Sequence, residues 1–309
     1  MTAGHLRKSA RVLGRVALLF AALSFVGCAT RMVPDTLAPA AAGQFDPVRR
    51  DYVDSRVGQI HLRKVEPGKV TDAKAPVMAL HLSPNSSQVF SAFLPLIGQD
   101  RRAVAPDYPG YGMSDPIPGT QRIEDYASSM WEVADALNLG LPIDLIGYHT
   151  GSAVALEMTR QRPQAVRRIV LVAVPVLTDE ERAGGAAIPY IAYDEEGEFA
   201  REEWQRSWRW RGPGQTVESV YATFAEKMRP GVRERGAHAV LSYDVVPSLK
   251  AARQPIMIVR VNDDLWEATA RARSIRPDAH WVELPEFGHG LFHVAPDAMN
   301  ALVREFLDQ

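Results

Sequence analysis

The stretch IDLIGYHTGSAVALEMTR, residues 143–160, contains one of the patterns that indicate the fold. It opens with a short apolar run typical of a buried strand and continues into a helical segment that ends before Pro163. Between the two, Gly147 and Gly151 stand two residues to either side of His149. Glycines at these positions let the backbone make a sharp turn. The stretch therefore predicts a strand, a tight turn with His149 exposed at its tip, and a helix.

Apolar runs of the same kind alternate with helical patterns along most of the chain. Such near-continuous runs are typical of strands that are buried on both faces of a sheet. We predict strands at 52–65 (a pair around Gly58), 77–82, 103–105, 143–146, 169–174, 256–261 and 281–284, and helices at 89–97, 123–137, 152–161 and 298–307. This alternation predicts an α/β fold with a mainly parallel sheet and helices on both faces.

The composition excludes several classes of protein. The 309 residues include 35 Lys and Arg against 37 Asp and Glu, and this net charge of −2 argues against nucleic acid as a partner. Hydrophobic residues make up 46% and charged residues 23%, which is typical of a globular chain rather than a disordered one. Cys28 is the only cysteine, so the sequence has neither an intramolecular disulfide nor a CxxC metal or redox site.

Residues 1–27 have the features of a secretory signal peptide. Basic residues precede an apolar run, Val16 to Val26, that is too short to span a bilayer as a helix. The following Gly27-Cys28 resembles the cleavage motif of bacterial lipoproteins. The resemblance implies lipidation of Cys28 and a membrane-anchored protein on the periplasmic side, with Ala29 typical of the outer membrane. The alternatives are an ordinary signal peptide or an uncleaved anchor. The Ala/Pro-rich residues 28–48 predict a tether.

A second motif carries a resemblance to a known family. Residues 105–115, APDYPGYGMSD, resemble the D-x-P-G-x-G-x-S turn of α/β-hydrolases. The turn at 147–151, the acidic pair Asp263-Asp264 and then Gly288-His289 follow in the order that this family uses for nucleophile, acid and histidine. The resemblance implies an α/β-hydrolase fold with a helical cap. We expect the core at 49–176 and 247–309, and the cap at 177–246.

The turn departs from the family pattern G-x-S-x-G because His149 stands where the nucleophilic serine is expected. Ser152 is a poor substitute, since it lies inside the first helical turn, about 5 Å along the axis from the tip. Three interpretations remain open. His149 is itself a nucleophile, or it positions substrate while His289 acts on a water or a substrate proton, or catalysis is lost and the fold binds a ligand.

The other site residues are implied by the same resemblance. His289 matches the general base and Asp264 the acid that orients it, with Asp263 the alternative; either aspartate is also suited to cap the helix that begins near Trp266. The backbone N–H groups of Ser83 and Thr150 match the oxyanion donors.

The residues around these donors also differ from the family. Leu82 replaces a family glycine beside Ser83, which adds bulk and disfavours a positive φ. We interpret His81 as a buried support of this loop.

The cap supplies the candidate substrate-binding residues. Trp204 and Trp208 are four residues apart and share one helical face, where they either pack the cap or line an apolar cleft. We find no phosphate-binding or dinucleotide motif and predict no cofactor. His289 and His293 have ligand spacing, but Gly290 between them disfavours a helix, so we predict no metal.

The sequence therefore predicts a monomeric hydrolase of a small apolar ester or acyl compound. A cofactor-free lyase or oxygenase, and a catalytically inactive binding protein, are the alternatives.

Overall fold

The computed structural model of the chain describes residues 47–67, 74–185, 193–229 and 231–309. The predicted signal peptide, the lipidation site Cys28 and nearly all of the predicted tether lie outside the described residues. Within those ranges, no helix has the length and the apolar character needed to cross a membrane.

A central sheet organises the described part of the chain, and eight of its strands fall in that part. They are β1 (Arg49–Ser55), β2 (Gly58–Val65), β3 (Val77–Leu80), β4 (Ala103–Pro106), β5 (Ile143–Tyr148), β6 (Val166–Val172), β7 (Ile256–Val261) and β8 (His280–Leu284). Their order in the sheet is β1-β2-β4-β3-β5-β6-β7-β8. The pairs β1–β2 and β2–β4 are antiparallel and the other neighbours are parallel, so the predicted mainly parallel sheet is confirmed.

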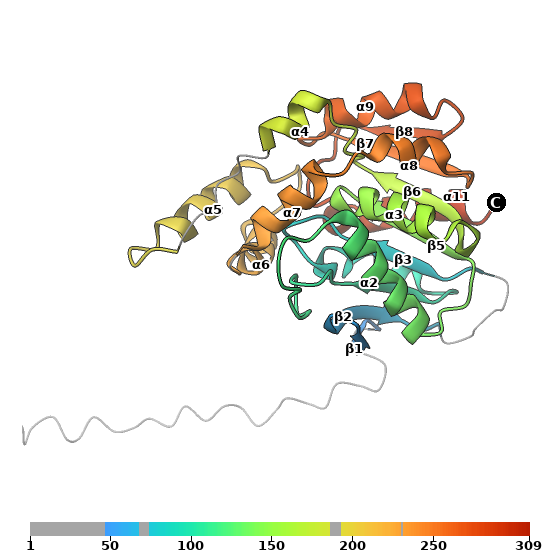
Figure 1. Cartoon of the computed structure of the whole chain (residues 1–309), viewed down its shortest axis with the longest axis horizontal. Helices are drawn as coiled ribbons and strands as arrows, with labels where there is room; N and C mark the ends of the chain where they lie inside the picture. Colours follow the sequence, from blue (N-terminus) through green and yellow to red (C-terminus); the bar gives the residue numbers. More distant parts are fainter. Residues whose placement is uncertain (1–46, 68–73, 186–192, 230) are drawn as a thin grey trace, which may run out of the picture. The chain divides into compact units, whose positions relative to one another are not determined.

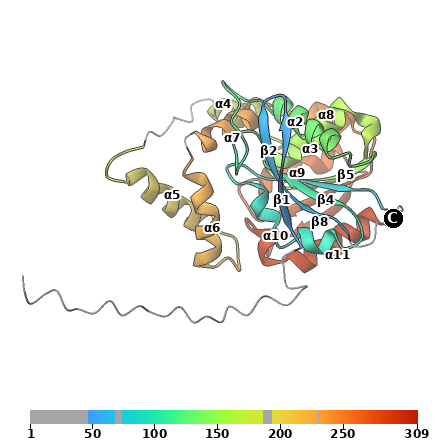
Figure 2. The ribbon, with the colours of Figure 1, turned by 90° about the horizontal axis from the view of Figure 1, so that it is seen from below.

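Helices cover both faces of this sheet, as predicted (Figure 1). The helices are η1 (Ser87–Phe90), α1 (Leu94–Ile97), α2 (Ile123–Ala136), α3 (Thr150–Gln161), η2 (Pro163–Ala165), α4 (Asp179–Gly185), α5 (Glu198–Arg209), α6 (Val217–Lys227), α7 (Val232–Leu241), α8 (Val245–Ala251), α9 (Trp266–Ile275), α10 (Leu291–Val294) and α11 (Pro296–Leu307). Figure 2 shows α2, α3 and α8 on one side of the sheet and α10 and α11 on the other.

The strands divide their side chains between two buried cores, because successive residues of a strand face opposite sides of the sheet. In β6, Ile169 and Leu171 pack with α2 and α3, whereas Val170 and Val172 pack with α1, α10 and α11. This explains why the inner strands β3 and β4 lack a polar face, whereas the edge strand β1 has exposed polar residues.

The structure corrects the predicted helix at 89–97. The segment forms two short elements, η1 and α1, instead of one helix. Ser86 begins the first by accepting a hydrogen bond from the N–H of Gln88, and Pro95 stands in the first turn of the second, where a missing N–H has no cost. The region predicted as the cap, 177–246, contains α4 to α7 and the first residues of α8.

The turn after β4 is built around a buried aspartate. Asp107 Oδ2 lies 2.7 Å from His61 Nδ1 and accepts the N–H of Met113 at 2.9 Å, while Oδ1 accepts the N–H of Ser87 at 2.8 Å. A Cβ on Gly112, whose φ is +48°, would lie 1.9 Å from Asp107 Oδ2. Only glycine fits there, which explains the second glycine of the D-x-P-G-x-G-x-S pattern.

Candidate active site

The predicted turn at His149 is a single residue between strand and helix. β5 ends at Tyr148 and α3 begins at Thr150, and His149 between them has φ 57° and ψ −111°, a conformation that L-residues seldom adopt. A Cβ on Gly151 would lie 2.0 Å from the carbonyl oxygen of Leu80, and one on Gly147 would lie 2.4 Å from the carbonyl oxygen of Gly151. Both glycines are therefore required for the close approach of helix and sheet.

Ser152 has a structural role instead of a catalytic one. Its hydroxyl is buried and lies 3.0 Å from the carbonyl oxygen of Val172 and 3.1 Å from that of Gly147, so it donates within the turn. This agrees with the expectation that Ser152 does not replace the missing serine nucleophile.

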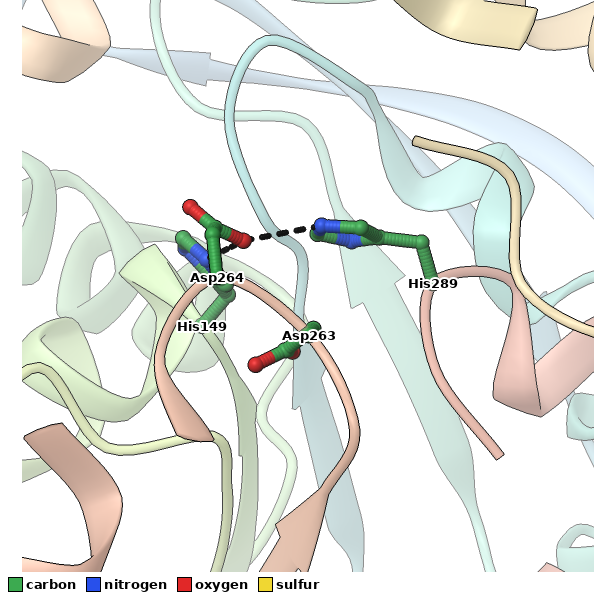
Figure 3. A group of neighbouring side chains, drawn as sticks. All are labelled: His149, Asp263, Asp264 and His289. Atoms are coloured by element: carbon green, nitrogen blue, oxygen red, sulfur yellow. Dashed lines mark hydrogen bonds and ion pairs between the residues drawn. The ribbon is translucent and has the colours of Figure 1, made fainter. Parts of the chain in front are cut away.

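Asp264 joins the two histidines of the predicted site. It follows β7 at the carboxyl edge of the sheet, and its Oδ1 lies 2.9 Å from His289 Nε2 and 3.3 Å from His149 Nε2. Figure 3 shows the Asp264 carboxylate between the two imidazole rings, whose centroids are 5.8 Å apart. The residue sits between the histidines, whereas a serine–histidine–aspartate relay has its acid at one end.

Asp263 stabilises the turn that precedes α9. Its Oδ1 accepts the N–H of Leu265 at 2.9 Å, at the start of α9. Its Oδ2 is buried and has no hydrogen-bond partner among the described residues. Leu265 is the N-cap residue of α9 and no side chain caps this helix, so Asp263 belongs to the turn before it, and Asp264 is the aspartate in reach of His289.

His149, Asp263 and Asp264 shift one another's pKa values. Burial opposes ionisation of Asp264, but hydrogen bonds from His149 and His289 hold its pKa well below the ordinary range. Burial likewise opposes the charged form of His149, yet the hydrogen bond to Asp264 and the charge of Asp263 raise its pKa. Burial raises the pKa of Asp263.

Ser83 and Thr150, the residues of the two predicted oxyanion donors, are in contact, but the N–H of Ser83 already has a hydrogen-bond partner. The N–H of Ser83 donates to Thr150 Oγ1 at 3.2 Å, and the two hydroxyls are 2.7 Å apart. A substrate oxygen would have to displace Thr150 Oγ1 to reach this N–H. Leu82 causes no backbone strain here, because it is not among the described non-glycine residues with positive φ.

His81 is a buried support of the same loop, as predicted. The N–H of Tyr108 donates to His81 Nε2 at 3.1 Å, which leaves Nδ1 to donate to the carbonyl oxygen of Leu82 at 2.8 Å. Burial lowers the pKa of His81 to about 4, so the ring is neutral near pH 7.

Residues 75–202 match a family described as alpha/beta hydrolase fold. The described part of the chain has the α/β-hydrolase fold. It is 26% identical over 238 residues to the 2-hydroxy-6-oxo-2,4-heptadienoate hydrolase of Pseudomonas putida, a match that covers 67% of this chain and 82% of that protein. It is 31% identical over 102 residues to the pyrrolizixenacetamide deacetylase of Xenorhabdus hominickii, covering 32% of this chain and 38% of that protein.

A solved structure gives the same fold. A thermophilic esterase from Thermogutta terrifontis superposes with a TM-score of 0.65 at 21% identity, over 84% of this chain and 98% of that one. The α/β-hydrolase fold predicted from the motif order is confirmed, and the two relatives above are hydrolases by name.

The aromatic side chains of the cap contact one another. Trp204 and Trp208 stack at 6.1 Å, and Trp204 also meets Phe224 of α6 edge-on at 5.5 Å. Trp204 thus packs α5 against α6, and contact of either tryptophan with substrate stays a prediction. Trp210 instead lies 6.5 Å from the His289 ring, perpendicular to it.

The sequence singled out Trp204 and Trp208 and gave Trp210 no role in the site. The loop that follows it explains its position, since a Cβ on Gly212 would lie 2.1 Å from the carbonyl oxygen of His289. This segment is in direct backbone contact with the site.

The site also meets a geometric requirement for cation binding. His149, Asp263, Asp264 and His289 each offer one ligand atom, and these atoms all lie within 4.8 Å of one another. His293, which the sequence considered as a ligand, is not a member of the group. The prediction of no metal rested on spacing along one helix, and such spacing carries no information about ligands from three separate loops.

Proposed function

We propose that this protein hydrolyses a small apolar ester or related acyl compound and that water is the attacking group. The observation that carries the proposal is the bridging position of Asp264, at 2.9 Å from His289 Nε2 and 3.3 Å from His149 Nε2. The hydrolases among the relatives support this reaction class.

In this arrangement His289 is the better general base. Asp264 holds one ring nitrogen of His289 and stabilises the imidazolium that forms when the other nitrogen accepts a proton from water. The side chain of His289 is 22% exposed, so water reaches it.

His149 is poorly placed to attack a substrate itself. Its Nε2 is engaged by Asp264, and its Nδ1 is buried without a partner in the described part of the chain. Its raised pKa favours the cationic form, which is a weak nucleophile but a good group for polarising a carbonyl. We therefore assign His149 to substrate positioning.

The test uses a graded panel of activated esters with the wild type, His149→Ala, His149→Ser and His289→Ala. We expect His289→Ala to lower kcat/KM by roughly 10²–10⁴-fold, the range of a lost general base, and no acyl adduct at residue 149. His293→Ala is the matched control and should retain the wild-type rate, because His293 lies outside the group.

Other results would favour the remaining interpretations. An acyl adduct trapped on residue 149, with turnover abolished in His149→Ala, would make His149 the nucleophile. A gain of esterase activity in His149→Ser would show a competent oxyanion site and native chemistry of another kind, such as a lyase or oxygenase. A folded wild type with no activity on any ester would favour a binding protein.

We also propose that the protein is a monomer anchored to a membrane, on the periplasmic side of the outer membrane, through lipidated Cys28. The support is the lipoprotein-like sequence before this single cysteine. The wild type should partition with membranes and Cys28→Ser should not. A wild type that is wholly soluble, with no mass added at Cys28, would contradict the anchor.

A further inference from the structure

We propose that His149, Asp264 and His289, with Asp263 beside them, form a binding site for one divalent transition-metal ion of the zinc type. The three ligand-bearing segments come from separate parts of the chain: the turn after β5, the loop after β7 and the loop after β8 (Figure 3). The consequence for catalysis rests on the proposed function, whereas the binding site itself does not.

The separations of the ligand atoms fit a shared metal ion. With metal–ligand bonds of about 2.05 Å, two ligands at angles of about 90° to 109° lie roughly 2.9–3.3 Å apart. The Asp264 Oδ1 to His289 Nε2 distance is 2.9 Å and the Asp264 Oδ1 to His149 Nε2 distance is 3.3 Å. In a tetrahedral site all ligand atoms lie about 3.3 Å apart, so the limit of 4.8 Å for the whole group requires a closing movement of at most about 1.5 Å.

The charge of the group favours a divalent cation. Among the described residues, no lysine or arginine forms an ion pair with Asp263 or Asp264. The two carboxylates carry two negative charges when ionised, and the buried Oδ2 of Asp263 has no donor in the described ranges. A buried carboxylate oxygen without a donor is costly, and a bound divalent cation would compensate it.

The replacement of serine by histidine is what completes the ligand set. A serine at position 149 would leave one imidazole and two carboxylates, whereas His149 adds a second nitrogen ligand on a backbone that is fixed by the flanking glycines. Two imidazoles and a carboxylate are a common set for zinc and for Fe(II), and they leave coordination positions open. A water at such a position has its pKa lowered to about 7, which would supply the nucleophile that the missing serine does not.

Direct binding measurements test the site without reliance on activity. The full chain, without a polyhistidine tag, is treated with EDTA, dialysed and titrated calorimetrically with ZnCl2. We expect one ion per chain with a dissociation constant in the micromolar range or tighter. His149→Ala, His289→Ala and Asp264→Asn should each weaken binding by at least about 100-fold, because each removes a ligand.

Controls separate the site from general histidine binding and from misfolding. His293→Ala and His280→Ala remove histidines outside the group and should leave the affinity unchanged. His149→Ser provides a second variant at the turn, and circular dichroism checks that each variant is folded. Absence of binding at millimolar zinc, or binding retained when His149 and His289 are both replaced by alanine, would overturn the metal site.

Ester hydrolysis by the EDTA-treated and the zinc-loaded protein distinguishes this inference from the proposed function. Full activity after EDTA together with no zinc binding removes the metal site and leaves the hydrolase. Zinc binding that depends on both histidines, with no hydrolysis of any ester in either state, leaves the metal site and removes the hydrolase.

Discussion

Two aspartate–histidine clusters follow parallel strands of this sheet, and they differ in how completely their polar atoms are paired. Asp107, after β4, is fully buried and contacts His61 and two backbone N–H groups. Asp264, after β7, is 44% exposed and contacts two imidazoles, and the neighbouring Asp263 Oδ2 has no partner among the described residues. The Asp107 group is therefore a closed cluster, in which both carboxylate oxygens are paired and buried. The group of Asp264 and Asp263 is an open cluster, which is partly exposed and has one unpaired carboxylate oxygen.

Pairing and access, more than residue type, separate a structural cluster from a chemical one. At Asp107 every acceptor is met by a donor that the fold holds in place, so nothing is left to bind a ligand. At Asp264 the partners are ionisable rings, and the side chains of His149 and His289 are 15% and 22% exposed.

The largest expected effect is on activity at the open cluster. Asp264→Asn should lower kcat/KM by roughly 10²–10⁴-fold, because the amide neither orients His289 nor stabilises its charged form as a carboxylate does. The free energy of unfolding should change by less than about 1 kcal/mol, since the carboxylate is nearly half exposed. Ester kinetics and urea denaturation on one preparation check both. A stability loss as large as that of Asp107→Asn would erase the contrast between the clusters.

At the closed cluster the expected effect is on stability. Asp107→Asn should lower the free energy of unfolding by about 3–5 kcal/mol, because an amide NH2 would face a buried donor where a carboxylate oxygen now accepts. Ser114→Ala is a milder companion, expected at about 1 kcal/mol, since Ser114 Oγ donates to the Asp107 carbonyl oxygen at 3.0 Å. Urea denaturation measures both. A cost below about 1 kcal/mol for Asp107→Asn would contradict the structural role.

The closed cluster extends to the cap through a pH-sensitive contact. The hydroxyl of Ser86 donates to Glu226 of α6, and Asp107 and Arg63 are the charged groups of the core near it. Burial, opposed by the Ser86 hydrogen bond, raises the pKa of Glu226 from 4.5 to about 7. Because the folded pKa is the higher one, the protonated form contributes stability that is fully present below pH 4.5 and is lost as the pH rises through 7.

Glu226→Gln should therefore remove part of the pH dependence of stability. Between pH 5 and pH 8 the wild type should lose about 1–2 kcal/mol relative to this variant. Urea midpoints of both proteins across this range measure the difference. Parallel curves would show that Glu226 does not titrate in the folded protein.

The smallest expected effect is on KM, and it distinguishes Trp210 from Trp204. Trp210→Ala should raise KM by up to about 10-fold with little change in stability, because the ring is 51% exposed and lies beside His289. Trp204→Ala should instead lower stability, since its ring packs between α5 and α6. Kinetics and thermal melting of the two variants decide. A KM change confined to Trp204→Ala would show that Trp204, as predicted from the sequence, contacts the substrate and that Trp210 does not.

The sequence indicated the fold because its decisive residues act locally. Glycine is required at Gly112, Gly147 and Gly151 because a Cβ at these positions would lie 1.9–2.4 Å from a neighbouring atom. A requirement of this kind is visible in the sequence as a fixed glycine spacing. The strands were predicted for the same reason, since burial on both faces removes polar residues. The prediction of one helix at 89–97 was wrong because apolar spacing does not show where a helix cap and a proline divide a segment into two.

By itself, then, the sequence determined the order of strands and helices, the turn with His149 at its tip and the candidates His289, Asp263 and Asp264. Only the tertiary structure decided that Asp264 stands between the two histidines, that Asp263 accepts the N–H of Leu265, and that Trp210 faces His289. The physical reason is distance along the chain. His149 and Asp264 are 115 residues apart, and the direction of each side chain follows from loops whose geometry depends on everything packed beneath them.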